Sequence, residues 1–142
     1  MTTTLDSTRS APSSRGMNIG LWVAQGLLGF AMTMAGLMKS TQPIEALSAK
    51  MPWVHHFPDL AVRGIGVVEF LGGVGLILPS ALRIMPRLTV FAALGLVLVM
   101  LGAAGTEVAI GNASHAAAPV VFMLMAAFIA WGRSSKAPIS SR

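Results

Sequence analysis

Glu69 is the residue whose position points most directly to chemistry, because it lies near the middle of the apolar stretch 60–79. A carboxylate at mid-membrane is energetically costly, and such residues commonly mark ion paths, proton relays or ligand sites. With about 100° between successive residues of a helix, Gly66 and Gly73 share a face with Glu69. Glycines allow a second helix to approach closely. We therefore expect Glu69 to face the bundle interior and Gly66, Gly72 and Gly73 to serve helix packing.

The sequence leaves the partner of Glu69 open. Arg63 precedes it by a separation that corresponds to about 120° around a helix and about 9 Å along it, which is poor for an ion pair within the helix. Glu69 is then protonated, hydrogen-bonded from Gln25 or Thr33 in the first apolar stretch, or paired with a cation from another helix. The alternative to a functional role is that Glu69 only fixes helix packing through such a bond.

A second group of polar residues is expected to meet at one end of the bundle. Lys39 follows the first apolar stretch, Arg63 begins the second, Glu107 ends the third and His115 precedes the fourth. Two cations, one carboxylate and an imidazole at the mouth of a bundle are able to bind an anionic headgroup, a quinone carbonyl or another substrate. The competing interpretation is that these side chains are interfacial charges that extend to water.

Several chemistries have no support in the sequence. The chain has no cysteine, which excludes disulfides, thiolate metal sites and thiol redox steps carried by this chain. His55 and His56 are adjacent and point to different faces of any regular element, and a lone His115 is weak evidence for a metal or haem ligand. HExxH, phosphate-loop and Ser/His/Asp patterns are also missing from the sequence. We therefore predict no metal site and no evident cofactor, with quinone as the one candidate.

The composition indicates the elements that must position these residues. Of 142 residues, 54% are hydrophobic and 11% charged, whereas a soluble domain carries about twice that charged fraction. About 20 apolar residues in a helix cross the hydrocarbon core, and continuous apolar runs indicate helices rather than barrel strands. We predict an all-α membrane protein, a four-transmembrane-helix bundle in the lipid bilayer. The expected spans are Met17–Met38, Leu60–Pro79, Leu88–Thr106 and Ala116–Gly132.

The rest of the chain is more polar. We expect a transmembrane domain over 17–132, flanked by disordered tails at 1–16 and 133–142. The longest connection contains a predicted short helix at 44–51, followed by aromatic residues that favour the membrane surface.

The basic residues give a prediction of topology. A sequence pI near 11.3 would suit nucleic-acid binding if the charges formed one patch, but they are spread over the ends of the spans, so we expect no nucleic-acid partner. One side of the predicted bundle has Arg9, Arg15, Arg83, Arg87, Arg133, Lys136 and Arg142. The other side has Lys39, Lys50 and Arg63. The positive-inside rule then places both termini in the cytoplasm.

The segment VVEFLGGVGLILP at 67–79 resembles the second-helix signature of the DoxX-like family. Residues 36–39 resemble the exit of that family's first helix, and residues 83–103 resemble its third helix and the approach to it. The resemblance covers about residues 17–132. It implies a small four-helix protein of the bacterial inner membrane. Some relatives are linked to thiosulfate:quinone oxidoreductase and others to redox-stress complexes, whereas most have no assigned activity.

One departure from the family pattern concerns the end of the third helix. Many relatives have a histidine there, followed by a Gly-Glu pair, whereas this chain has Glu107 and then Gly111-Asn112. A function that depends on that histidine would need His115 as its substitute.

Three functions remain open at this point. The first is an accessory membrane subunit that packs against its own copies or a membrane or redox partner; four short spans leave little room for a large cavity, which favours it. The second is a redox-associated subunit that binds a quinone or small lipophilic ligand near Glu69 and Arg63, in which case the chain is the membrane subunit of a quinone-linked oxidoreductase rather than a stand-alone enzyme. The third is a proton-coupled small-molecule exporter in which Glu69 titrates.

Overall fold

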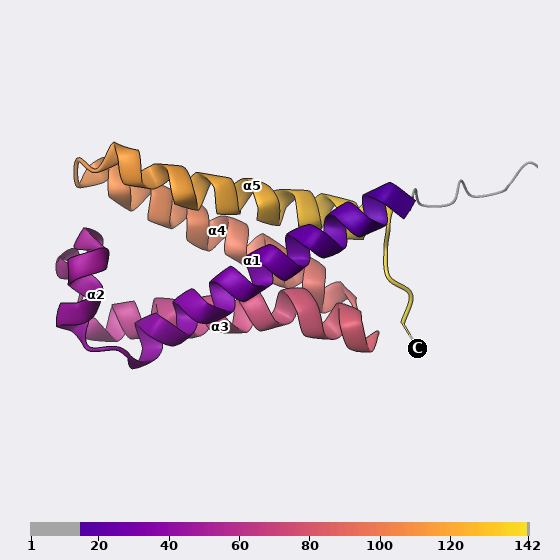
Figure 1. Cartoon of the computed structure of the whole chain (residues 1–142), viewed down its shortest axis with the longest axis horizontal. Helices are drawn as coiled ribbons and strands as arrows, with labels where there is room; N and C mark the ends of the chain where they lie inside the picture. The colour runs from indigo at the N-terminus through magenta and orange to yellow at the C-terminus, as the bar shows by residue number, and fades with distance from the viewer. Residues whose placement is uncertain (1–14, 142) are drawn as a thin grey trace, which may run out of the picture.

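The computed structural model describes residues 15–141, and these form helices joined by short turns (Figure 1). Four helices are long and apolar enough to cross a membrane, which confirms the predicted fold class. They are α1 (Arg15–Thr41), α3 (Asp59–Leu82), α4 (Arg87–Ala109) and a fourth span, Ala113–Lys136. The fourth span consists of the 3-10 turn η2 (Ala113–Ala116), α5 (Ala117–Trp131) and the π-helical turn η3 (Gly132–Lys136). Between α1 and α3 lie α2 (Ile44–Lys50) and the 3-10 turn η1 (Pro52–His56).

Successive spans run in opposite directions, so α1 begins at the same end of the bundle at which the C-terminal segment lies (Figure 1). We call this end the terminal end. The opposite end, which holds α2, η1 and η2, is called the α2 end. Many large apolar side chains point outward along the spans, among them Leu27, Phe30, Leu71 and Leu98. Such an apolar exterior fits a lipid environment rather than water.

Local sequence explains where the helices begin and end. Proline occupies the position before α2, α3 and α4, where a missing N–H costs nothing. Helix α4 ends in a Schellman motif, in which Asn112 N donates to Glu107 O at 2.8 Å and Gly111 N donates to Val108 O at 3.1 Å. Gly111 has φ +84°, a left-handed conformation that suits glycine at this position.

Glycines bring α1 and α3 into close contact. A Cβ built on Gly66 would lie 2.9 Å from Gly36 O, and one built on Gly73 would lie 2.7 Å from Gly29 O. Both distances are shorter than normal contacts, so a methyl group at either position would push the two backbones apart. Gly72 faces α4 instead, with Leu96 Cδ2 at 2.8 Å from the corresponding Cβ position. Each of the three glycines predicted for packing thus lies against a neighbouring helix.

The buried apolar residues form two clusters. The larger cluster joins all four spans, with Leu28 from α1, Leu76 from α3, Leu96 from α4 and Ile129 from α5 among its members. The smaller one, made of Leu47, Val54 and Val62, holds α2 and η1 against α3 at the α2 end. The predicted helix at 44–51 is present as α2. Its packing fixes the connection over the mouth of the bundle.

The predicted tails differ from the structure where the two can be compared. Most of the segment 1–16 lies outside the described residues, but Arg15 and Gly16 already belong to α1. The segment from Arg133 onward continues α5 into η3, and Ala137 is buried. It does so because Arg133 is anchored to α1 by hydrogen bonds, a contact that the polar composition of the segment does not reveal.

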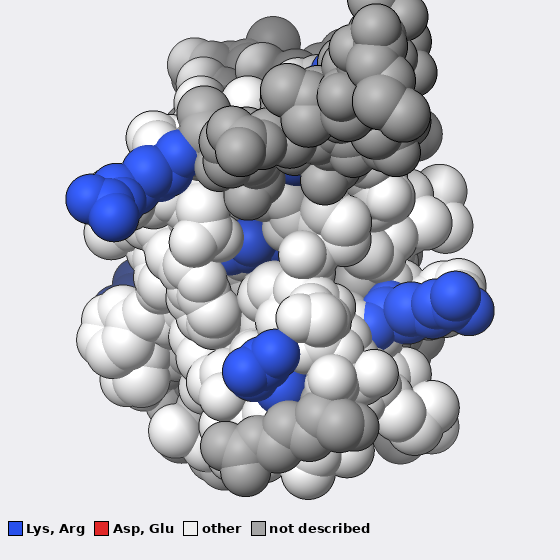
Figure 2. Space-filling view, turned by 90° about the vertical axis from the view of Figure 1, so that its right-hand side faces the viewer, with Lys and Arg blue, Asp and Glu red and all other residues white. Residues whose placement is uncertain are grey.

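Charge is distributed unevenly between the two ends. The terminal end carries the described residues Arg15, Arg83, Arg87, Arg133 and Lys136. Figure 2 views this end and shows basic side chains, without any visible acidic one, on its described surface. All acidic residues in the described range, which are Glu45, Asp59, Glu69 and Glu107, belong to the α2 half. Arg9 and Arg142 lie outside the described residues.

Candidate functional site

A buried ion pair joins α1 to α3. Lys39 Nζ lies 2.7 Å from Glu69 Oε2 and 2.9 Å from Glu69 Oε1, and the two residues are 8% and 2% exposed. Because α1 and α3 touch at Gly36 and Gly66, the Lys39 side chain starts close enough to α3 to reach the carboxylate. Of the alternatives left open for Glu69, the structure contains the cation from another helix.

The two other predicted partners of Glu69 make different bonds. Gln25 Nε2 donates to Leu76 O at 2.6 Å, and Thr33 Oγ1 donates to Gly29 O at 2.6 Å. Neither of these two candidates therefore bonds to Glu69. Gln25 lies more than three helical turns before Lys39 along α1, toward the terminal end. The Thr33 hydroxyl bonds within its own helix, at a point where α1 lies against Gly73 of α3.

Arg63 acts on the end of α1 rather than on Glu69. Its Nη1 donates to Lys39 O at 2.8 Å, and the side chain is half-buried. Carbonyls of the last helical turn have no partner within the helix, so a guanidinium that binds one fixes the end of that helix. Arg63 thereby holds the backbone from which the Lys39 ammonium extends.

Glu107 is a buried carboxylate without a full set of partners. It is 7% exposed, and its Oε2 has no hydrogen-bond partner within residues 15–141. The Schellman motif fixes its position, because Glu107 O accepts the Asn112 N–H that closes α4. A buried polar atom without a partner is unfavourable, and in native structures it calls for an explanation such as a ligand or water.

These residues line one cavity of about 730 Å³ at the α2 end. Lys39 comes from α1, Glu69 from α3, Glu107 from α4 and His115 from η2. The remaining wall is largely apolar and includes Met32, Met100 and Phe122 from the spans and Trp53 and Phe57 from the connection. The four short spans were expected to leave little room for a large internal cavity. The pocket at the α2 end is partly open and forms because α2 and η1 add a wall that no span provides.

The structure thus brings four of the five candidate polar residues together, whereas Arg63 lies behind Lys39 and outside the lining. Trp53 and Phe57 were expected at the membrane surface but not as part of a site. Their rings pack edge to face with centroids 5.7 Å apart, and Lys39 Nζ lies 5.7 Å from the Trp53 ring centroid. Their aromatic character, in the connection after the predicted short helix at 44–51, was the only sequence signal for this wall.

The cavity offers complementary hydrogen-bonding groups in an apolar enclosure. Lys39 uses two N–H bonds on Glu69, and its third N–H has no acceptor among the described residues. Glu107 Oε2 is an acceptor, and the exposed His115 imidazole is able to donate or accept. Within residues 15–141, no three His, Asp or Glu side chains are grouped to hold a metal ion. A lipophilic molecule with a polar head matches this lining. The volume of the cavity lies in the usual range for ligand pockets.

Comparison with known proteins agrees with the four-span architecture. The model of the DoxX-like family matches residues 23–129, which include the second and third spans in full and most of the first and fourth. No curated protein and no solved structure is similar enough to count as a match. Because the family model covers well over half of the chain, this integral membrane protein belongs to the DoxX-like family.

Proposed function

We propose that the chain is an accessory, redox-associated membrane subunit that binds a small lipophilic ligand with a quinone-type head in the α2-end cavity. The observation that carries the proposal is the convergence of Lys39, Glu69, Glu107 and His115, from four elements, on one apolar cavity. A carbonyl oxygen of such a ligand would accept the third N–H of Lys39. A ring hydroxyl, in the reduced form, would donate to Glu107 Oε2 and so satisfy it.

The remaining lining supports the same class of ligand. Trp53 and Phe57 offer aromatic faces for a planar ring, and the methionines at 32 and 100 supply adaptable apolar surface for a tail. A quinone supplies two-electron chemistry when bound, whereas this chain has no cysteine to exchange electrons through a disulfide. We therefore assign electron delivery to a partner protein. Together with that partner, the chain would form a quinone-linked oxidoreductase, in which it takes part as a single copy or as a homo-oligomer.

We further propose that the protein lies in the bacterial inner membrane with the terminal end in the cytoplasm. The excess of Arg and Lys at that end supports this orientation. A C-terminal fusion to a fluorescent protein that matures only in the cytoplasm should fluoresce, whereas a fusion to periplasmic alkaline phosphatase should remain inactive. The reverse pattern would contradict the orientation.

The ion pair argues against proton-coupled export through Glu69, because both carboxylate oxygens already accept hydrogen bonds from Lys39. For this reason we prefer ligand binding to export as the role of the cavity.

Quenching of tryptophan fluorescence by a short-chain ubiquinone analogue tests the proposal. Trp53 lines the cavity, whereas Trp22 and Trp131 belong to the other half of the bundle. In detergent micelles, we expect saturable quenching that is largely lost in Trp53→Phe. For the reduced, hydroquinone form of the analogue, which has the ring hydroxyl that would donate to Glu107, Glu107→Gln should weaken the apparent affinity about fivefold, equivalent to a loss of about 1 kcal/mol. Glu45→Gln, an exposed residue outside the cavity, should leave that affinity unchanged. Quenching that does not saturate would refute quinone binding in this cavity. So would an apparent affinity that is the same in Glu107→Gln as in Glu45→Gln.

A further inference from the structure

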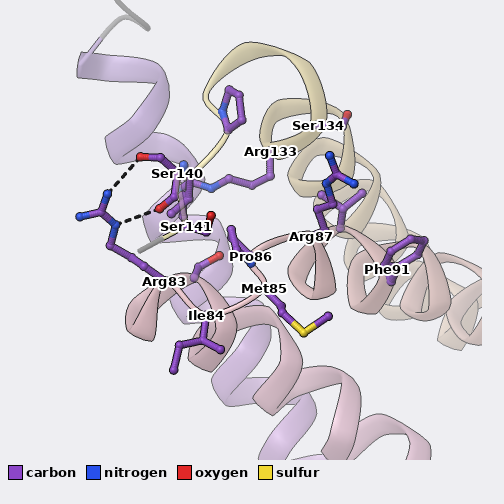
Figure 3. Close-up of a pocket in the computed structure, with 14 residues that line it drawn as sticks. Arg83, Ile84, Met85, Pro86, Arg87, Phe91, Arg133, Ser134, Ser140 and Ser141 are labelled. Carbon is purple, nitrogen blue, oxygen red and sulfur yellow. Dashed lines mark hydrogen bonds between the residues drawn. The ribbon is translucent and has the colours of Figure 1, made fainter.

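A second cavity, of about 1010 Å³, lies at the terminal end (Figure 3). Its wall is built from the turn between α3 and α4, the first turns of α4, η3 and the C-terminal segment. The charged residues in this wall are Arg83, Arg87 and Arg133, and no acidic residue is among the described lining residues. The cavity is therefore positively charged on several sides.

Arg133 is a buried cation with only neutral partners. It is 4% exposed, its Nε donates to Gln25 Oε1 at 2.5 Å, and its Nη1 donates to Asn18 Oδ1 at 2.7 Å and Ala137 O at 2.9 Å. The guanidinium also lies 5.2 Å from the Trp22 ring centroid. Its Nη2 is buried and has no partner within residues 15–141.

This arrangement calls for an anion. A buried charge is normally paired with its opposite, because the interior does not replace the hydration that the ion loses. The described part of the chain offers Arg133 no carboxylate, since its acidic residues belong to the other half of the bundle. An anion in the adjoining cavity would supply the missing negative charge and lower the cost of keeping Arg133 buried.

The mouth of the cavity carries two exposed arginines. Arg83 donates from Nε and Nη2 to Ser140, at 3.0 Å in each case, and so holds the C-terminal segment along the opening (Figure 3). Arg83 has φ +56°, which ends α3 and turns the chain toward α4. Arg87 follows in the first turn of α4 and is exposed. Arg83 retains N–H donors on its Nη atoms beyond its two bonds to Ser140. These donors, like those of Arg87, suit phosphate oxygens.

The rest of the wall is apolar, with Ile84, Met85, Phe91 and Ile139. Because α3, α4 and η3 all end or begin here, the cavity lies where the spans leave the hydrocarbon core and lipid phosphates are found. A basic cavity between transmembrane helices, with apolar side chains beside it, is suited to an anionic lipid headgroup and the first part of its acyl chains.

We propose that this cavity binds the phosphate headgroup of an anionic phospholipid, with Arg83 and Arg87 on the phosphate at the mouth and Arg133 as the buried counter-charge. This inference does not depend on the function of the α2-end cavity, because the two sites share no lining residue. Bound lipid would also join the end of α3, the start of α4 and η3, the elements at which these three arginines lie.

Native mass spectrometry of the purified full-length protein, exchanged into nanodiscs of defined composition, tests the proposal. With equal amounts of phosphatidylglycerol and phosphatidylcholine, the wild-type protein should retain phosphatidylglycerol preferentially. Each basic residue near anionic lipid contributes roughly a fivefold effect, so Arg83→Gln/Arg87→Gln should lower the retained phosphatidylglycerol by about 25-fold. Both residues are exposed, so this variant should still fold.

Arg15→Gln/Lys136→Gln provides the matched control, because it removes the same charge at the same end from exposed residues outside the cavity. It should leave retention within about twofold of wild type, as expected if only cavity residues contact the headgroup. Equal losses in both double variants, or no preference for phosphatidylglycerol in the wild type, would overturn the proposal.

Two further measurements complete the test. Arg133→Gln should also reduce retention of phosphatidylglycerol, and a variant that binds it as the wild type does would remove Arg133 from the site. Inorganic phosphate at millimolar concentration, added in detergent without lipid, should leave the thermal unfolding midpoint unchanged. Stabilisation by free phosphate as large as that by phosphatidylglycerol would assign the site to a soluble anion and overturn the lipid assignment.

Discussion

Lys39 and Glu69 form an ion pair across the α1–α3 contact, and each carboxylate oxygen accepts one hydrogen bond from the same ammonium group. Lys39 lies two residues before the end of α1, whereas Glu69 lies well inside α3. The lysine side chain thus reaches inward from the mouth of the bundle. It neutralises a carboxylate that would otherwise be an unpaired charge inside an apolar cluster of helices.

Removing one partner of this pair should destabilise the protein strongly. Glu69→Gln leaves the ammonium buried and unpaired, and Lys39→Met does the same to the carboxylate; losses of this kind cost about 3–5 kcal/mol. The double variant Lys39→Met/Glu69→Gln leaves no buried charge at this position and should regain a large part of the loss. Thermal unfolding midpoints in one detergent measure all three. The pairing would be contradicted if the loss of stability in the double variant equalled the sum of the losses in the two single variants.

Glu107→Gln should behave in the opposite way to Glu69→Gln. Within residues 15–141, one carboxylate oxygen of Glu107 has no hydrogen-bond partner, so removing the charge relieves a desolvation cost of about 1–3 kcal/mol without breaking a side-chain hydrogen bond of that oxygen. We expect the unfolding midpoint of the ligand-free protein to stay level or rise. A fall as large as that of Glu69→Gln would show that Glu107 is part of a structural bond and not a free acceptor in the cavity.

Alanine substitution of three α3 glycines should separate helix propensity from helix packing. Gly64 has open space around its Cβ position, so Gly64→Ala should gain up to about 1 kcal/mol of helix propensity. Gly66→Ala pushes against Gly36 O in the α1 backbone, and overpacking of this kind costs about 1–3 kcal/mol. Gly72→Ala meets the end of the flexible Leu96 side chain and should lie between the two. Unfolding midpoints that follow another order would contradict the described α1–α3 contact.

Gly111 should be replaceable by asparagine more readily than by alanine. Its φ of +84° is left-handed, a region that costs most side chains about 1–2 kcal/mol and asparagine less. Because Gly111 closes α4 just after Glu107, we expect Gly111→Ala to lower both the unfolding midpoint and the affinity for the reduced form of the quinone analogue. Gly111→Asn should retain most of each. Equal effects of the two substitutions would count against the Schellman motif as the element that positions Glu107.

Much of the candidate site was visible in the sequence because the membrane makes each polar residue conspicuous. Lys39, Glu107 and His115 mark the ends of apolar stretches, and antiparallel spans bring such ends to one depth. Glu69 stands out for the same reason. Their meeting at one cavity could not be predicted, because α2 and η1 close its wall through packing of Leu47 and Val54, and short helices leave only a weak periodic signal.

The number of spans, their order and the family follow from the amino-acid sequence, because apolar length and charge placement are properties of local segments. The packing of the helices was needed to show that Lys39 rather than Gln25 or Thr33 binds Glu69 and that Arg133 is buried beside α1. The same packing leaves one Glu107 oxygen without a partner among residues 15–141. Each of these depends on how closely two helices approach and on their relative rotation. The distance and the rotation between two helices are set by glycine contacts such as that of Gly36 with Gly66. The hydropathy of two apolar helices does not specify these contacts, because helices of equal hydropathy can pack in different ways.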